Sequence, residues 1–267
     1  MRAAEVRALV GEARNLGFAL RAEMAPASAG PIVVTGVLAE QLAKELGAGA
    51  RPGAVVFGSG PPPPHAEVLV HVVAGDPSPE DEALVDEADA RGVEVVIVEL
   101  WPQPEWIRPF VLSPFVVECR AGEGFPVREI AARIVEATEG STVLAADVPV
   151  LANVARAGLV KQAVIRSAII GLAGERLGRS RPLLAMEQVR MVSRLRSVSS
   201  GTAVSDELPV LAGGAAAVFA SGFLLRGVAR TARVFLPAPV AHAAVAAAGT
   251  WALAKAFQVL ESRVPPS

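Results

Sequence analysis

The sequence predicts an α/β domain with a parallel sheet, followed by an all-α hydrophobic helical domain. Apolar runs at residues 68–74 and 93–100 flank a helical pattern, and a third run at 115–119 leads into another helix. Continuous Val, Ile and Leu runs suit parallel strands that are buried on both faces. Beyond Gly140 the pattern is helical throughout.

The first quarter of the chain predicts these elements in order. Residues 1–24 carry apolar side chains at helical spacing, which indicates an amphipathic helix. A strand at 32–35, a helix at 37–46 and a short strand at 54–57 follow. The proline run at 61–64 can form neither a helix nor a central strand, so we expect a stiff connector there.

The centre of the α/β half is a strand–helix–strand unit. Ser78 stands two residues before Glu80-Asp81-Glu82, so we expect it to cap a helix with an acidic, solvated first turn. That helix should end at Gly92. The final helix of this half is expected at residues 127–139.

The second half predicts long helices. We expect two helices within residues 148–172, divided near Gly158, and a further helix at 182–198 that Pro182 opens at its first position. Two very apolar segments, 208–225 and 239–260, follow a polar linker.

Charge divides the chain in the same way. Residues 1–140 carry 11 basic and 21 acidic side chains, whereas residues 141–267 carry 14 and 6. We therefore expect an N-terminal helix at 1–25, an acidic α/β domain at 26–140 and a basic helical domain at 141–267. The basic half has few aromatic residues to interleave with its charges, which disfavours nucleic-acid binding.

Cysteine and histidine give little sign of a metal or redox site. Cys119 is the single cysteine, lies in a predicted buried strand and fits a reducing cytoplasm. The three histidines are scattered, and we expect His71 to be a core histidine with its polar groups satisfied rather than a ligand. No metal is expected.

The α/β half resembles the P-loop GTPase fold over residues 31–139. From residue 66 the chain reads AEVLVHVVAGDPSPEDEALVDEADARGVEVVIVELWPQ, which is similar to a late βαβ unit of that fold. From residue 115 it reads FVVECRAGEGFPVREIAARI, which is similar to the last strand, the following turn and the final helix. The resemblance implies a truncated GTPase-like parallel sheet.

The nucleotide-binding motifs that the resemblance implies are replaced. If Gly36 were the first glycine of a P-loop, the Gly-Lys-Ser/Thr positions would be Gln41, Leu42 and Ala43. These side chains supply neither the lysine for the phosphates nor the hydroxyl for Mg²⁺. The magnesium-binding and base-reading positions are also lost, the latter to Trp101-Pro102-Gln103. We therefore expect no nucleotide cofactor and no catalytic residue.

The helical half resembles a domain of unknown function that follows GTPase domains in bacteria. The resemblance rests on Gln188 with Met191, on Pro237-x-Pro239 and on Gly249-Thr250-Trp251-Ala252-Leu253. Two such halves favour a non-catalytic pseudo-GTPase scaffold or adaptor at the cytoplasmic face of the inner membrane or on a helical partner. The alternatives are a divergent GTP-binding protein or NTP hydrolase with other ligands, a purely soluble adaptor, and an integral membrane protein with a C-terminal two-helix hairpin.

Two sets of residues are candidates for partner or membrane contact. Trp101 and Trp106 stand in a proline-rich loop after a strand, and exposed tryptophans are common interface anchors. Arg226, Arg230 and Arg233 fall on one helix face between the two apolar segments, where they could meet anionic headgroups. Small residues in these segments also allow a homo-oligomer through the C-terminal helices.

Overall fold

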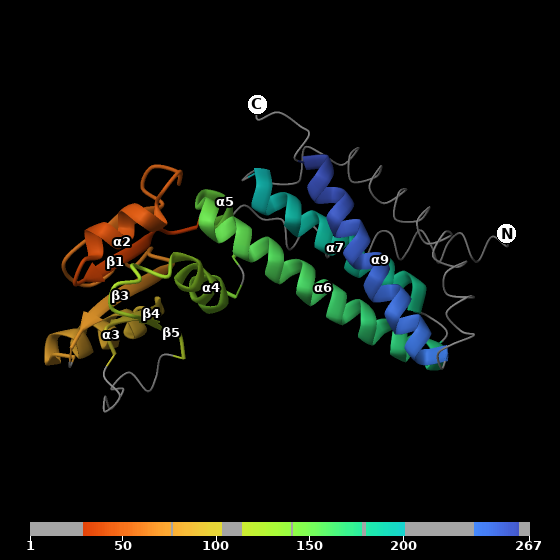
Figure 1. Ribbon diagram of the computed structural model, residues 1–267, viewed down its shortest axis with the longest axis horizontal. Coiled ribbons are helices and arrows are strands. Elements are labelled where there is room, and N and C mark those ends of the chain that lie inside the picture. The colour runs from red at the N-terminus through yellow and green to blue at the C-terminus, as the bar shows by residue number, and fades with distance from the viewer. Residues whose placement is uncertain are drawn as a thin grey trace. The chain divides into compact units, whose positions relative to one another are not determined.

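The computed structural model describes residues 29–75, 77–102, 114–139, 141–177, 180–200 and 238–261. The chain divides into two compact units. One contains the sheet and extends through Ala157, and the other contains Gly158–Ser197 and the last helix. Figure 1 shows the sheet with its helices and the separate group of long helices. The expected helix at 1–24, the apolar segment 208–225 and most of the Trp loop lie outside the described residues.

The first unit is built on a five-stranded, all-parallel sheet, which confirms the α/β prediction. The strand order is β2-β1-β3-β4-β5. The strands are β1 (Ile32–Gly36), β2 (Val55–Phe57), β3 (Val68–Ala74), β4 (Glu94–Leu100) and β5 (Val116–Cys119). The chain moves from β1 outward to β2, then crosses back to β3 on the other side of β1. The point between β1 and β3 is therefore a topological switch point, where open α/β sheets bind ligands.

Helices cover both faces of the sheet. The helices α2 (Ala39–Leu46) and α4 (Val127–Ala137) pack on one face, and α3 (Pro79–Ala90) packs on the other. Alternate strand residues point to each side because side chains alternate along a strand. The α3 side holds a core cluster of eight buried residues: Val33, Ala66, Leu69, Val73, Ala88, Val93, Val95 and Ile97.

The start of α3 confirms the predicted cap. The Ser78 side chain accepts a hydrogen bond from the Asp81 backbone N–H, and the Asp81 carboxylate accepts one from the Ser78 N–H. This reciprocal capping box satisfies two amide groups that a helix end otherwise leaves without partners. Asp81 is thereby held at the first turn, close to the carboxyl ends of the strands.

The remaining described helices are α5 (Thr142–Asp147), α6 (Pro149–Leu177), α7 (Ser180–Ser200) and α9 (Ala238–Glu261). The break expected near Gly158 was wrong, because α6 is one helix of 29 residues that passes through it. A single glycine costs a helix only about 1 kcal/mol relative to alanine, which tertiary packing easily outweighs. Likewise α7 begins at Ser180, so Pro182 lies inside its first turn rather than at the first position.

The helical unit has an apolar cluster and a polar one. Ala163, Met191, Leu195 and Ala254 form a buried cluster across α6, α7 and α9. Beside it, Thr250 Oγ1 lies 2.9 Å from Ser167 Oγ and 3.3 Å from Gln188 Nε2, and all three side chains are buried. Because each helix contributes one polar group, this hydrogen-bond network fixes the register of the three helices.

Candidate functional site

The turn between β1 and α2 lies at the switch point, where a nucleotide-binding fold would hold phosphate. It consists of only Val37 and Leu38. The Val37 N–H donates to the Val72 carbonyl at 3.0 Å, so the turn is closed against β3. Gly36 has a φ of 92°, and a Cβ at this position would lie 2.0 Å from the Val72 oxygen. Glycine is therefore required here by close strand packing and backbone conformation.

Gln41, Leu42 and Ala43, the positions that match the phosphate-binding motif, lie on α2, and their side chains point into the core or along the helix surface. Leu42 is fully buried and Ala43 is nearly so. Gln41 is exposed, and its Nε2 donates to Glu45 Oε1 at 2.9 Å one turn later. Two of the three side chains thus belong to the core, and the third is engaged along the helix surface.

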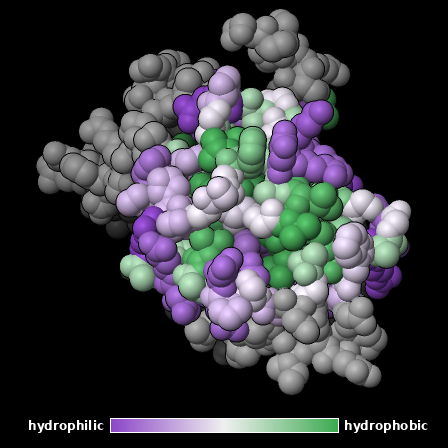
Figure 2. All heavy atoms as spheres, turned by 90° about the vertical axis from the view of Figure 1, so that its left-hand side faces the viewer, coloured by the Kyte–Doolittle hydropathy of each residue, from purple (hydrophilic) through white to green (hydrophobic). Residues whose placement is uncertain are grey.

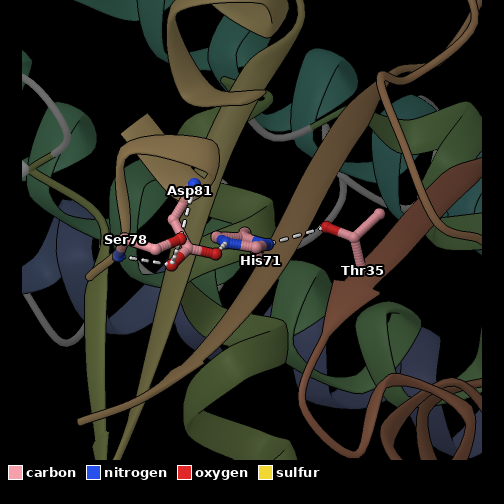
Figure 3. Close-up of polar contacts among 4 residues, drawn as sticks. All are labelled: Thr35, His71, Ser78 and Asp81. Carbon is pink, nitrogen blue, oxygen red and sulfur yellow. Dashed lines mark hydrogen bonds and ion pairs between the residues drawn. The ribbon is translucent and has the colours of Figure 1, made fainter. Parts of the chain in front are cut away.

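A buried polar chain crosses the sheet beside the switch point (Figure 3). Thr35 and His71 are neighbours in register on β1 and β3, and Thr35 Oγ1 lies 2.9 Å from His71 Nδ1. On its other side, His71 Nε2 lies 2.9 Å from Asp81 Oδ1 of α3. The second carboxylate oxygen of Asp81 accepts from the Ser78 N–H and hydroxyl, both at 2.8 Å.

These contacts determine the protonation states of His71 and Asp81. Burial lowers the pKa of His71 from its ordinary value of 6.5, although the hydrogen bond and charge of Asp81 act in the opposite direction. Burial alone would raise the pKa of Asp81, but hydrogen bonds from Ser78 and His71 outweigh it and leave this pKa below its ordinary value. A neutral His71 facing a carboxylate donates from Nε2, so Nδ1 accepts from the Thr35 hydroxyl.

The order hydroxyl, imidazole, carboxylate is that of a hydrolase triad, but the hydroxyl is enclosed. Thr35 and His71 are 1% and 2% exposed. A nucleophile must come within bonding distance of its substrate, and these side chains lie between the sheet and α3. The network therefore joins β1, β3 and α3 structurally. This confirms the prediction that His71 is a satisfied core histidine.

The carboxyl edge of the sheet is apolar at its surface. Val37 and Leu38 after β1, Phe57 at the end of β2 and Trp101 after β4 are all exposed, with Phe57 at 60%. The strands point toward the left in Figure 1, and Figure 2 shows hydrophobic residues gathered near the middle of that face with hydrophilic ones around them. We call Val37, Leu38, Phe57 and Trp101 the edge surface.

Two residues of the edge surface have unfavourable backbone conformations. Leu38 has a φ of 57° and Trp101 a φ of 54°. Few residues with large side chains adopt this left-handed region. The Trp101 N–H donates to the Cys119 carbonyl at 2.8 Å, which anchors the residue while its ring stays half exposed.

A pocket of about 440 Å³ lies beside β5 rather than at the switch point. It carries three carboxylates and two guanidinium groups, and its lining is Val116, Glu118, Arg120, Glu123, Gly124, Pro126, Glu129 and Arg133. Its acidic groups would repel phosphate, which disfavours it as a nucleotide site.

Cys119 is buried, and its Sγ–H donates to the Gly124 carbonyl. Burial raises the pKa of this thiol, and the charges of Glu123 and Glu45 raise it further, so it is a poor nucleophile. Across the described parts of the chain, no group of three or more His, Cys, Asp or Glu side chains is placed to hold a metal ion.

Several residues singled out from the sequence cannot be placed in this site. The degenerate motif position Gln103 and the predicted contact residues Trp106, Arg226, Arg230 and Arg233 lie outside the described residues. The sequence reasoning missed that Asp81 turns inward to His71, since it assigned Asp81 to the solvated acidic face of α3. A histidine in an otherwise apolar strand, followed ten residues later by a capping aspartate, is the signal that could have found this pair.

Comparison with protein-family models, with curated proteins and with solved structures found no match for this chain.

Proposed function

We propose that this protein is a non-catalytic, pseudo-GTPase-like scaffold that works at the cytoplasmic face of the inner membrane. The β1–α2 turn carries the proposal. The first N–H of this turn, that of Val37, donates to the Val72 carbonyl. Leu42 lies in the core, at the position where a P-loop has its lysine. A phosphate-binding loop needs several free backbone N–H groups around the ligand. Two residues closed against a neighbouring strand do not supply them.

The edge surface supports a scaffold with a protein partner. Ligands of open α/β folds bind at the carboxyl edge of the sheet, and here that edge presents apolar side chains. Exposed aromatic side chains such as Trp101 and Phe57 are frequent anchors of protein interfaces. Backbone strain at Leu38 and Trp101 gives an independent reason to assign a role to these side chains, since strained residues cluster at functional positions.

The helical unit supports membrane association. Within α9, the stretch Pro239–Val259 is long and apolar enough to cross a membrane, and 28% of it is buried. Thr250 and Ala254 of α9 contact α6 and α7, and Ala241 and Ala246 are also buried. We propose peripheral attachment of this helix rather than insertion. We further propose that Arg226, Arg230 and Arg233 contact anionic headgroups.

Nucleotide addition tests the non-catalytic proposal. A ligand at 1 mM with a Kd of about 10 μM would stabilise the folded state by roughly 2.7 kcal/mol. We expect Mg-GTP and Mg-ATP to leave the melting temperature unchanged. A clear rise with either nucleotide would contradict the proposal and favour a divergent nucleotide hydrolase.

Fractionation of the full-length protein tests its location. We expect it in the membrane fraction, with release by high salt or by carbonate. Resistance to both treatments with extraction only by detergent would favour the integral alternative, in which a C-terminal helix spans the bilayer. Recovery in the soluble fraction alone would leave the soluble adaptor as the better description.

A further inference from the structure

One end of the helical unit exposes large apolar side chains on all three of its described helices. They are Ile165, Ile169 and Leu172 on α6, Leu183 and Met186 on α7, and Val240 on α9. Each is between 39% and 58% exposed. The α6 residues are spaced by four and three positions, and the α7 residues by three, so each set occupies one helix face. We call these six residues the apolar tip.

Contacts between the helices place these residues at the same end. A Cβ at Gly171 of α6 would lie 2.9 Å from Ala243 Cα of α9, so Leu172 and Val240 are at one level. Arg166 of α6 reaches Glu187 of α7 at 3.4 Å, which brings Met186 level with Ile165 and Ile169. Figure 1 shows the end of α6 and the starts of α7 and α9 at the same end of this group of helices.

This end of the unit combines a buried polar network with exposed apolar side chains. Ser167, Gln188 and Thr250 are inside and hydrogen-bonded to one another, whereas the six apolar side chains face outward. A soluble helix normally buries its apolar stripe and exposes its polar face. Large exposed apolar patches mark contact with a partner or with lipid.

Charge indicates which of these occupants fits. Lys161 is exposed on α6, one turn before Ile165. The sequence from the last turn of α6 into the first turn of α7, residues 174–182, reads GERLGRSRP and contains three arginines against one glutamate. Apolar side chains beside an excess of basic residues complement a bilayer with anionic headgroups.

We propose that the apolar tip docks this protein onto a bilayer surface that contains anionic lipid. The six side chains enter the boundary between headgroups and acyl chains, and Lys161 remains at headgroup level. The contact is shallow because the Arg166–Glu187 pair, next in sequence to Ile165 and Met186, bridges α6 and α7 at the inner margin of the tip. Full insertion would bury that pair in hydrocarbon, which is unfavourable.

This inference rests on the proposed membrane association, and vesicle binding by the full-length protein tests both. The probes are phosphatidylcholine vesicles with and without phosphatidylglycerol, and binding is measured by co-sedimentation. The test variant is Ile169→Asp with Leu183→Asp, and a milder second variant replaces both residues by Gln. The matched control is Val259→Asp, a half-exposed apolar residue near the other end of α9.

We expect the wild type and the control to bind vesicles that contain phosphatidylglycerol. The partition coefficient of the Asp pair should fall at least about tenfold, because two aliphatic side chains that enter the bilayer become charged. The Gln pair should lose binding in the same direction, with circular dichroism unchanged. As a direct readout, the tryptophan fluorescence of Ile169→Trp should be quenched by brominated acyl chains more than that of Val259→Trp.

The contrary outcomes separate the two ideas. A wild type that binds neither kind of vesicle contradicts the membrane part of the proposed function. If the wild type binds vesicles and the Asp and Gln double variants bind as well as the wild type, the apolar tip is contradicted but the proposed membrane association is not. A wild type that self-associates without lipid, with monomeric tip variants, would make the tip an interface between copies and would also overturn the inference.

Discussion

Nε2 of His71 lies 2.9 Å from Oδ1 of Asp81, so a buried histidine in the middle strand of the sheet is joined to the first turn of α3. The histidine side chain is 3% exposed and the aspartate side chain 26%. The pair is completed by Thr35 on one side and by Ser78 on the other. These four residues join two neighbouring strands to the helix that covers them.

The pair makes stability depend on pH. The pKa of His71 is lowered in the folded state, so the unfolded chain binds the proton more readily. The free energy of unfolding should therefore be largest above pH 6.5 and fall as the pH drops below it. Because the pKa of Asp81 is also lowered, a further loss should follow below its ordinary value of 3.8.

Urea unfolding at a series of pH values measures this dependence. His71→Gln keeps a polar side chain without titrating, so its decline near pH 6.5 should be weaker than that of the wild type. His65 is exposed on a loop, and His65→Gln should reproduce the wild-type decline. Equal declines in wild type and His71→Gln would show that the pair does not control acid stability.

The polar network of the helical unit gives a second prediction. Thr250→Val keeps the shape of the side chain but removes the hydroxyl that Ser167 and Gln188 contact. Leaving those buried groups without a partner should lower the free energy of unfolding by about 1–3 kcal/mol. Thr138→Val is the comparison, since its hydroxyl bonds to the Ile134 carbonyl within its own chain segment and is only partly buried. A smaller loss at Thr250 than at Thr138 would contradict a role of the network in holding the helices together.

Leu38 gives a third prediction, because its left-handed backbone suits other residues better. Asn adopts this conformation more readily than leucine, and Leu38 is exposed and makes no side-chain cap. Leu38→Asn should therefore raise the free energy of unfolding by about 0.5–1 kcal/mol. Val37→Asn, at the neighbouring exposed position without a positive φ, should give no gain. A loss on Leu38→Asn in chemical denaturation would mean that its side chain stabilises the fold and is not kept for a partner.

The sequence predicted the sheet well because the signal for buried parallel strands is local. The run that forms β3 was predicted with the observed ends, Val68 and Ala74, and Ser78 was predicted as the cap of α3. The His71–Asp81 pair was not predictable in the same way. Strand periodicity says which face His71 occupies, but only the packing of α3 on that face decides which carboxylate meets it.

The helical half was harder to predict, because the sequence shows which positions are apolar but not which other helices pack against them. Ile169 and Leu172 fit a buried stripe in the sequence, yet α7 and α9 cover the other side of α6. Gly158 was predicted to end a helix from its local propensity alone. That local propensity did not decide the outcome, since α6 runs unbroken from Pro149 to Leu177.

The two glycines of α6 give the last prediction, since the same substitution should have opposite effects on one helix. A Cβ at Gly158 would meet no atom within 4 Å, so Gly158→Ala should raise the free energy of unfolding by about 0.5–1 kcal/mol through the lower entropy of the unfolded chain. A Cβ at Gly171 would lie 2.9 Å from the backbone of Ala243 and His242 in α9. Backbone atoms cannot rotate away as a side chain can, so Gly171→Ala should force α6 and α9 apart and lower the free energy of unfolding by about 1–3 kcal/mol. Chemical denaturation followed by circular dichroism measures both variants under one set of conditions. A gain of stability in Gly171→Ala equal to that in Gly158→Ala would show that α9 does not approach α6 at this level, and the common end of α6 and α9 in the apolar tip would lose its support.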